Sequence, residues 1–208
     1  IKFDSSGELD IEETMKNHSV LHGAQGYVIP GFYGSLPSGM IKTLGRNSSD
    51  ISGALIAKLT GATLYEKWTR GVSGVCMADP KVIPEARKIS TTTYRELREL
   101  SYSGATVLHD NVIPLLQNLG IPLHVHNTDE PDDEGTIIFR DTEVSGQNPG
   151  LIGMAGRKNF TVFTLTKTLM NEEVGFLRRV CGVFENFKVN IEHTPWGIDT
   201  WMVVVESD

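Results

Sequence analysis

The sequence predicts an α/β fold in which helices flank a sheet of mostly parallel strands, followed by a smaller α+β unit. Over residues 1–140, helical patterns of roughly 10–15 residues alternate with short strand patterns, as in βαβ proteins. Two strand patterns run into glycine-bearing loops, and loops that follow strands lie at the edge where open α/β sheets bind ligands. After residue 150 the pattern changes to strands around one helix.

The elements of the first part follow from hydrophobic spacing and from glycine stops. We expect strands at 27–32, 62–69, 122–127 and 136–139. We expect helices at 11–22, from Ile51 to the stop at Gly61, at 93–102 and at 107–119. The Gly-, Ser- and Pro-rich segment 33–50 is a long loop or a hairpin.

The second part begins after an acidic, apolar-poor segment at 141–150, which we interpret as a linker between domains 1–140 and 151–208. We expect strands at 151–155, 161–166, 189–193 and 200–205, and a helix at 174–187. This is a β-α-β-β unit, and a complete ferredoxin-like fold needs one more helix and strand. The unit is therefore predicted to leave an unpaired strand edge.

Composition excludes several classes of function. The formal net charge is −7 without a basic stripe, so neither nucleic acid nor an anionic membrane is a predicted partner. The two cysteines, Cys76 and Cys181, form no metal-binding or disulfide pattern, which favours a reducing cytoplasm. No apolar run reaches the roughly 18 residues of a membrane span, and the first residues lack the apolar core of a signal peptide.

The segment TLGRNSSD (43–50) is the first candidate site. It places Arg46 in a glycine-containing loop and Ser48, Ser49 and Asp50 at a helix start, where free N–H groups favour an anion. The Arg46 guanidinium suits a carboxylate or phosphate, and Asp50 suits a substrate ammonium group. The alternative is that one of the three polar residues only caps the helix.

The loop from Thr69 to Lys81 is the second candidate. Gly71 and Gly74 permit unusual backbone angles and the close approach of a ligand. The pair Asp79-Pro80 is equally typical of a plain turn. The spacing matches neither GxGxxG nor the Walker A motif, so the local pattern is a weak signal for nucleotide.

His124 and His126 alternate along one predicted strand and so share a face. A metal pair is conceivable, but neither a carboxylate nor a third histidine stands at ligand spacing. A structural or solvated role is therefore the default, and no metal site is predicted.

In order, these segments resemble aspartokinase, a member of the amino-acid-kinase family with a carboxyl-terminal ACT domain. The similar segments are GFYGS (31–35), TLGRNSSD (43–50), EKWTRGVSGVCMADPK (66–81), ELRELSYSGATVLHD (96–110), IPLHVHNT (121–128) and GTII (135–138). The ACT-like segments are RKNFTVF (157–163), LMNEEVGF (169–176) and EHTPWGIDT (192–200). The resemblance implies the nucleotide-side lobe of an αβα sandwich, lacking the amino-terminal lobe, followed by a partial ferredoxin-like ACT domain.

The resemblance implies transfer of the ATP γ-phosphoryl group to the side-chain carboxylate of L-aspartate, with Mg²⁺. This would be the first step of lysine, threonine and methionine biosynthesis under amino-acid feedback, in the cytoplasm. Arg46 would bind an aspartate carboxylate and Asp50 its α-amino group, and the rest of that wall would be Phe32, Thr43 and Ser49. The nucleotide site would include Thr69, Gly74, Asp79 and Lys81. The effector site, most simply for lysine and usually across a homodimer, would include Met170, Gly175, Phe176, Asn190, Ile191 and Glu192.

The sequence departs from the family pattern at three places, and two of them, Asn47 and Arg70, motivate an alternative function. Asn47 and Ser48 replace two glycines of the family's RGGSD, and Arg70 with Gly71 replaces an aspartate after Thr69. Thr106 stands where many members have a lysine. The alternative is a non-catalytic amino-acid sensor, either a regulatory subunit or a degenerate kinase. On either interpretation, this piece alone is predicted to lack kinase activity.

Overall fold

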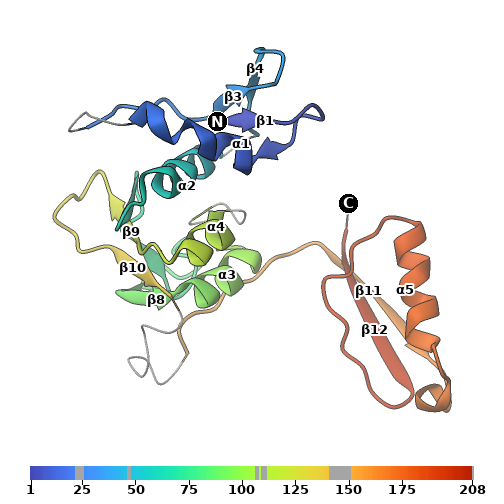
Figure 1. Ribbon diagram of the computed structural model, residues 1–208. Helices are drawn as coiled ribbons and strands as arrows, with labels where there is room; N and C mark the ends of the chain where they lie inside the picture. The colour runs from blue at the N-terminus through green and yellow to red at the C-terminus, as the bar shows by residue number, and fades with distance from the viewer. Residues whose placement is uncertain (22–25, 46–47, 106–107, 109–111, 141–150, 208) are drawn as a thin grey trace. The chain divides into compact units, whose positions relative to one another are not determined.

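The computed structural model describes residues 1–21, 26–45, 48–105, 108, 112–140 and 151–207. It divides into two compact units, Ile1–Gly156 and Arg157–Asp208 (Figure 1). The predicted linker at 141–150 lies outside the described residues. Residues 151–156 belong to the first unit, and the strand expected at 151–155 does not form. The Met154 N–H donates one hydrogen bond of 2.7 Å to the Met77 carbonyl, and a single bond makes no ladder.

A small four-stranded sheet contains residues from the start of the chain. Its strands, in the order β2-β1-β3-β4, are Leu9–Asp10, Lys2–Phe3, Tyr33–Ser35 and Ile41–Thr43. Strands β3 and β4 form an antiparallel hairpin with Tyr33 opposite Thr43, so the hairpin alternative for segment 33–50 is confirmed for its first part. The expected strand at 27–32 is irregular, because Pro30 has no N–H to donate and Phe32 has a positive φ of 77°.

The first predicted helix is shorter than expected. Helix α1 covers Ile11–Met15 and continues as a 3₁₀ helix, η1, over Lys16–Leu21. It begins at Asp10, whose carboxylate accepts a hydrogen bond of 2.8 Å from the Glu13 N–H.

The central sheet positions the second candidate loop. Its strands, in the order β5-β9-β10-β8, are Tyr65–Thr69, Leu123–Asn127, Thr136–Phe139 and Thr91–Thr93. Strands β5 and β9 are parallel, as are β10 and β8, but β9 and β10 are antiparallel. Only residues 128–135 connect β9 to β10, which is too short for a parallel crossover of roughly a dozen residues. Two of the three pairings are therefore parallel, as expected of a mostly parallel sheet, and the antiparallel β9–β10 pairing makes the sheet mixed. The α/β class is confirmed.

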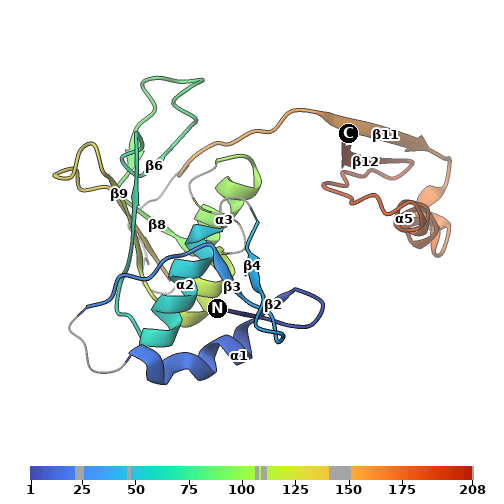
Figure 2. The same cartoon turned by 90° about the horizontal axis from the view of Figure 1, so that it is seen from above.

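Three helices lie on one side of this sheet in both views (Figures 1 and 2). They are α2 (Ser49–Thr60), α3 (Tyr94–Tyr102) and α4 (Val112–Leu119). Helix α2 ends at Gly61, which adopts the left-handed conformation with φ 61°. Helix α3 begins with a capping box between Thr93 and Glu96. Among the described residues, no helix combines the length and apolar character that a membrane crossing requires.

The core of the first unit lies between these helices and the sheet. Its buried members include Ala54, Tyr94, Leu97, Val112, Ile113, Leu116, Leu123, Val125 and Ile138. Tyr94 is fully buried, and its hydroxyl donates a hydrogen bond of 2.5 Å to the Ile121 carbonyl just before β9. This bond joins α3 to the strand that carries the two histidines.

We expect Tyr94→Phe to lower the free energy of unfolding by about 1–3 kcal/mol, because it leaves the Ile121 carbonyl without its buried donor. Urea unfolding of the 208-residue chain measures the change. The matched control is Tyr27→Phe, where the ring is 45% exposed. An equal effect of both substitutions would contradict the assigned role of the Tyr94 hydroxyl.

The second unit is a two-stranded antiparallel sheet with one long helix. It contains β11 (Phe160–Thr166), the 3₁₀ turn η2 (Met170–Glu172), α5 (Phe176–Asn186) and β12 (Thr200–Glu206). Phe160 pairs with Glu206 and Thr166 with Thr200. The core consists of Met170, Trp201, Val203 and Val205, with Phe176 and Val180 of α5 packed against it.

The strand expected at 189–193 is not formed. Pairing with the other edge of β12 begins only at Glu192, whose N–H donates to the Val204 carbonyl at 2.9 Å. Isolated bridges join His193 to Val204 and Trp196 to Trp201. Lys188 has a positive φ of 56°, so the chain is still turning out of the helix where the strand was expected.

Candidate functional site

The first candidate site is organised around the N-terminus of α2. Arg46 and Asn47 lie outside the described residues. Ser48 occupies the N-cap position and is buried, but its side chain makes no capping hydrogen bond. The simple capping alternative is therefore not what this helix start shows. Ser49 is exposed on the first turn.

Asp50, in that first turn, forms an ion pair that sequence reasoning missed. Its carboxylate accepts a hydrogen bond of 2.6 Å from the Lys67 ammonium of β5. The two side chains are only 15% and 17% exposed. The missed partner lies 17 residues away and reaches Asp50 only because β5 packs beside α2. The pair fixes the start of α2 against the strand that leads into the second candidate loop.

Phe32 is held in the left-handed region, which is uncommon for a residue with a bulky side chain. Its N–H donates to the Ser52 hydroxyl at 2.9 Å, and its carbonyl accepts from the Leu44 N–H at 2.8 Å. These bonds join the Phe32 backbone to α2 and to the residue after Thr43. The structure therefore connects Phe32, Thr43 and the α2 helix, although Thr43 itself is exposed.

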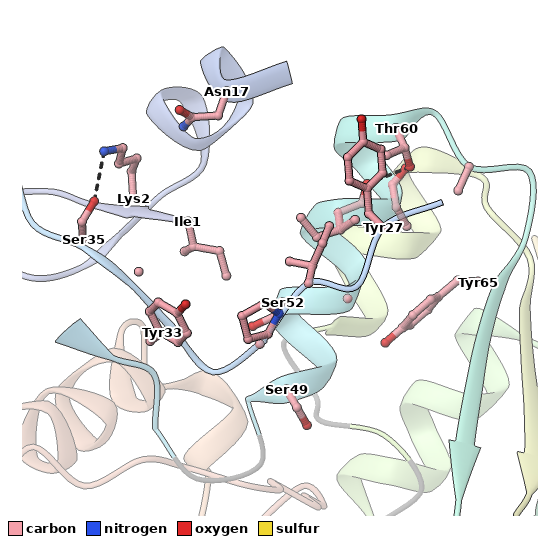
Figure 3. A pocket seen from close by; sticks show the side chains of 18 of the residues that line it. Ile1, Lys2, Asn17, Tyr27, Tyr33, Ser35, Ser49, Ser52, Thr60 and Tyr65 are labelled. Atoms are coloured by element: carbon pink, nitrogen blue, oxygen red, sulfur yellow. Dashed lines mark hydrogen bonds between the residues drawn. The ribbon is translucent and has the colours of Figure 1, made fainter. Parts of the chain in front are cut away.

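A cavity of about 870 Å³ adjoins this region, between β3, α2 and the start of the chain (Figure 3). Ser49 and Ser52 line it from α2, but Phe32, Thr43 and Asp50 do not. Most other lining residues are apolar, including Tyr27, Ile29, Pro30, Ile41, Ile56 and Leu64. Such a lining suits packing more than the binding of a charged amino acid.

Tyr65 also lines this cavity. Burial raises its pKa to about 12, and the nearby Asp50 carboxylate acts in the same direction. A Cβ at Gly53 would lie 2.4 Å from the Tyr65 hydroxyl, so the ring requires glycine at that point of α2. The hydroxyl therefore stays neutral and structural across the physiological range.

The second candidate loop follows β5 and is held by hydrogen bonds to the side chain of Asn127, at the end of β9. The buried Asn127 side chain accepts a hydrogen bond of 3.1 Å from the Gly71 N–H and donates one of 2.9 Å to the Ser73 hydroxyl. Ser73 donates in turn to the Glu130 carboxylate at 2.7 Å. None of these contacts has a local sequence signal, because each joins residues more than 50 positions apart.

The predicted nucleotide residues occupy different parts of that loop. Thr69 ends β5, and its carbonyl accepts from the Thr128 N–H at 2.9 Å. Gly74 is buried with φ 104°, and an added Cβ would lie 2.4 Å from the Thr136 hydroxyl. The Asp79 carboxylate accepts a hydrogen bond of 2.9 Å from the Lys81 N–H, so Asp79-Pro80 forms the plain turn that its sequence equally predicts.

Arg70 and Gly71, which depart from the family pattern, are accommodated. The Arg70 guanidinium is 87% exposed and lies 3.3 Å from the Asp129 carboxylate. It therefore points away from the core, and an exposed pair of this kind adds little stability.

The second unit has its own pocket, of about 250 Å³. It is lined by Met170, Asn171, Glu173, Gly175, Phe176, Leu177, Trp196, Gly197 and Ile198. Three predicted effector residues therefore line one pocket, whereas Asn190, Ile191 and Glu192 do not. Ile191 packs on the core, and Asn190 donates to the Glu192 carboxylate at 2.7 Å.

Glu173 is the charged residue among those that line this pocket. A hydrogen bond from Lys167 is the main cause that holds its pKa below the ordinary value of 4.5, and burial opposes the shift. Arg179 also contacts the carboxylate. The folded state thus favours the ionised carboxylate.

This shift predicts the pH dependence of the second unit. A carboxylate with a lowered folded pKa stabilises above its unfolded pKa, and the contribution disappears as pH falls through the folded pKa. Glu173→Gln should therefore destabilise at pH 7 and lose this effect as the pH falls through the lowered pKa of Glu173. In a Trp68→Phe background, tryptophan fluorescence reports this unit alone, since Trp196 and Trp201 remain. Glu172→Gln is the control, and a pH-independent effect of Glu173→Gln would contradict the prediction.

Comparison with known proteins now defines the class of this chain. The model of the amino acid kinase family matches residues 4–127, and the chain belongs to this family. It is 35% identical to aspartokinase 3 of Bacillus subtilis over 198 residues, which is 95% of this chain and 43% of the relative. The chain thus spans less than half the length of that relative.

Solved structures agree with this assignment. The aspartate kinase of Clostridium acetobutylicum superposes with a TM-score of 0.89 at 43% identity, over 100% of this chain and 48% of that one. Escherichia coli aspartokinase III, in complex with aspartate and ADP, gives a TM-score of 0.77 at 27% identity, over 100% of this chain and 47% of that one. The structure of Escherichia coli aspartokinase III in complex with lysine and aspartate gives a TM-score of 0.71 at 27% identity. The match covers 99% of this chain and 47% of that one.

Proposed function

We propose that the complete protein is an aspartokinase, which transfers the γ-phosphoryl group of ATP to the side-chain carboxylate of L-aspartate and forms 4-phospho-L-aspartate. The observation that carries the proposal is the 35% identity to an aspartokinase over 95% of this chain. Aspartate-dependent release of ADP by the complete protein tests it.

The aspartate side of the site is proposed at the N-terminus of α2. In this proposal Arg46 binds a substrate carboxylate, Asp50 binds the α-ammonium, and the wall is completed by Phe32, Thr43 and Ser49. The start of α2 supports it, because the first N–H groups of a helix attract an anion. The substrate ammonium would share the Asp50 carboxylate with Lys67, which keeps that carboxylate fixed before the substrate arrives.

The nucleotide side is proposed at the loop after β5, with Thr69, Gly74, Asp79 and Lys81. The loop follows a strand whose neighbour β9 is parallel, so both carboxyl ends meet at the edge where open sheets bind ligands. The Asn127 network fixes the loop shape, which favours transfer by positioning. Mg²⁺, when bound with ATP, neutralises charge on the transferred group, and no described residue is assigned as its ligand.

The second unit is proposed as an ACT-type effector domain. Lysine is the proposed effector, since a solved relative is described in complex with lysine and aspartate. Glu173 offers a carboxylate for an effector ammonium in the pocket of Met170, Gly175 and Phe176. The proposed residues Asn190, Ile191 and Glu192 lie outside that pocket, which supports an effector site completed by a second copy in a homodimer.

The proposal places the protein at the first step of lysine, threonine and methionine biosynthesis, with feedback by an end product and a cytoplasmic location. For the 208-residue chain alone we expect no phosphoryl transfer, because it spans only 43% of its aspartokinase relative. Phosphoryl transfer by the isolated chain would contradict this.

The competing function is a sensor without catalysis, which is favoured by Arg70 in place of the family's aspartate. Calorimetric titration of the chain with lysine, threonine and methionine, and then with Mg-ATP, separates the two. Binding of Mg-ATP that is weakened by Lys81→Ala, at an exposed residue of the predicted nucleotide site, supports the kinase. If both the 208-residue chain and the complete protein bind an amino-acid effector but do not bind Mg-ATP, the sensor is supported.

A further inference from the structure

The face of the central sheet opposite the α2, α3 and α4 core carries a cluster that the proposed phosphoryl transfer does not use. In the parallel pairing of β5 with β9, Glu66 is in register with His124, and Trp68 with His126. Side chains two residues apart point to the same face. Glu66, Trp68, His124 and His126 are therefore neighbours, whereas Leu123 and Val125 point into the core.

His126 is the unusual member of this cluster. It is only 9% exposed, yet neither of its ring nitrogens has a hydrogen-bond partner among the residues that the structure describes. Its Nε2 lies 3.3 Å from Glu66 Oε1, which is within ion-pair range but lacks hydrogen-bond geometry. A buried polar group without a partner is costly, so its retention requires an explanation.

The spacing of the cluster suits a metal ion. One candidate ligand atom from each of Glu66, His124 and His126 lies within 4.8 Å of the others. In a tetrahedral shell with bonds of roughly 2.0–2.1 Å, two ligand atoms are about 3.3–3.4 Å apart. The 3.3 Å between His126 Nε2 and Glu66 Oε1 fits one edge of such a tetrahedron.

The Glu134 carbonyl and the Trp68 ring hold the two histidine rings in orientations that suit metal binding. His124 Nε2 lies 2.7 Å from the Glu134 carbonyl. Because that carbonyl can only accept, Nε2 donates and the lone pair of a neutral His124 is on Nδ1. A backbone acceptor behind a ligating histidine is a common supporting contact. The Trp68 ring stacks on His126, with centroids 4.4 Å apart and planes 12° from parallel, and so fixes the plane of its imidazole.

We propose that Glu66, His124 and His126 form a binding site for a borderline divalent transition metal of the Zn²⁺ class, with its fourth position open to water. Two imidazoles and one carboxylate select Zn²⁺ or Co²⁺ over the hard cations Mg²⁺ and Ca²⁺. The site is therefore separate from the magnesium that accompanies ATP. It joins β5 to β9, whose last residues, Thr69 and Asn127, begin and hold the second candidate loop.

The test is a calorimetric titration of the untagged, chelator-treated 208-residue chain with ZnCl₂. We expect one ion per chain for the wild type and for His193→Asn, a control at an exposed histidine of the second unit. For Glu66→Gln and His124→Asn, we expect affinity to fall by at least the roughly 10–100-fold that loss of a supporting contact costs. Glu66 is 48% exposed at its side chain, so its substitution preserves the fold, which circular dichroism checks.

A second readout is the visible spectrum with Co²⁺, which should show the bands of a four-coordinate ion in the wild type and lose them in Glu66→Gln. Absence of saturable Zn²⁺ binding by the wild type would overturn the proposal. Binding that survives both Glu66→Gln and His124→Asn, or that His193→Asn removes, would also overturn it.

Discussion

Gly74→Ala should destabilise the first unit by about 2–6 kcal/mol. Roughly 1–3 kcal/mol comes from holding a non-glycine residue in a disfavoured backbone region. A further 1–3 kcal/mol, roughly, comes from overpacking. The new Cβ would lie 2.4 Å from the Thr136 hydroxyl and 3.0 Å from the Thr136 nitrogen. It would displace the hydroxyl that accepts from the Val75 N–H and donates to the Ile89 carbonyl.

Gly71→Ala provides a matched control in the same loop. Gly71 also has a positive φ, of 71°, but nothing lies within 4 Å of an added Cβ. It should cost only the roughly 1–2 kcal/mol of the left-handed conformation. Urea unfolding of both variants compares them directly. Equal destabilisation would show that the contact with Thr136 does not determine the conformation at Gly74.

Asp50→Asn should impair both stability and activity of the complete protein. Removing one partner of a buried ion pair costs roughly 3–5 kcal/mol, and less here because Asp50 and Lys67 are 15% and 17% exposed. If Asp50 binds the substrate ammonium, losing that charge should cost about 2–5 kcal/mol of binding, which lowers kcat/KM for aspartate roughly 30-fold or more.

The double variant Asp50→Asn/Lys67→Met separates the two roles. Replacing both charges of a buried pair is often neutral for stability, so urea unfolding should recover most of the loss. The kcat/KM for aspartate should stay low, because the substrate ammonium still lacks its carboxylate. Recovery of activity together with stability would mean that Asp50 serves only the fold.

Local sequence signals predicted the elements that depend on neighbouring residues. Helix α3 (Tyr94–Tyr102) forms where a helix was expected at 93–102, and α2 stops at Gly61, as expected. The glycine pattern also pointed to Gly74, whose φ of 104° excludes a side chain. By contrast, the apolar run at 27–32 looked like a strand but contains Pro30, and no strand forms there.

The contacts that complete the sites depend on strand register, which a single sequence does not contain. Asn127 reaches Gly71, and Glu66 lies beside His126, only because β5 pairs with β9, while Lys67 reaches Asp50 because β5 packs beside α2. The histidines were visible in the sequence, but the carboxylate beside them stands 58 and 60 residues earlier in the chain. The substrate roles of the candidate residues remain predictions.

The proposed function requires that the complete protein phosphorylates aspartate. The most direct measurement is an assay of the complete protein with ATP, Mg²⁺ and L-aspartate in the presence of hydroxylamine, which converts an acyl phosphate to a hydroxamate. We expect ADP and hydroxamate in equal amounts, both dependent on aspartate and both reduced by Asp50→Asn. ADP release without hydroxamate, or no ADP at all, would contradict it.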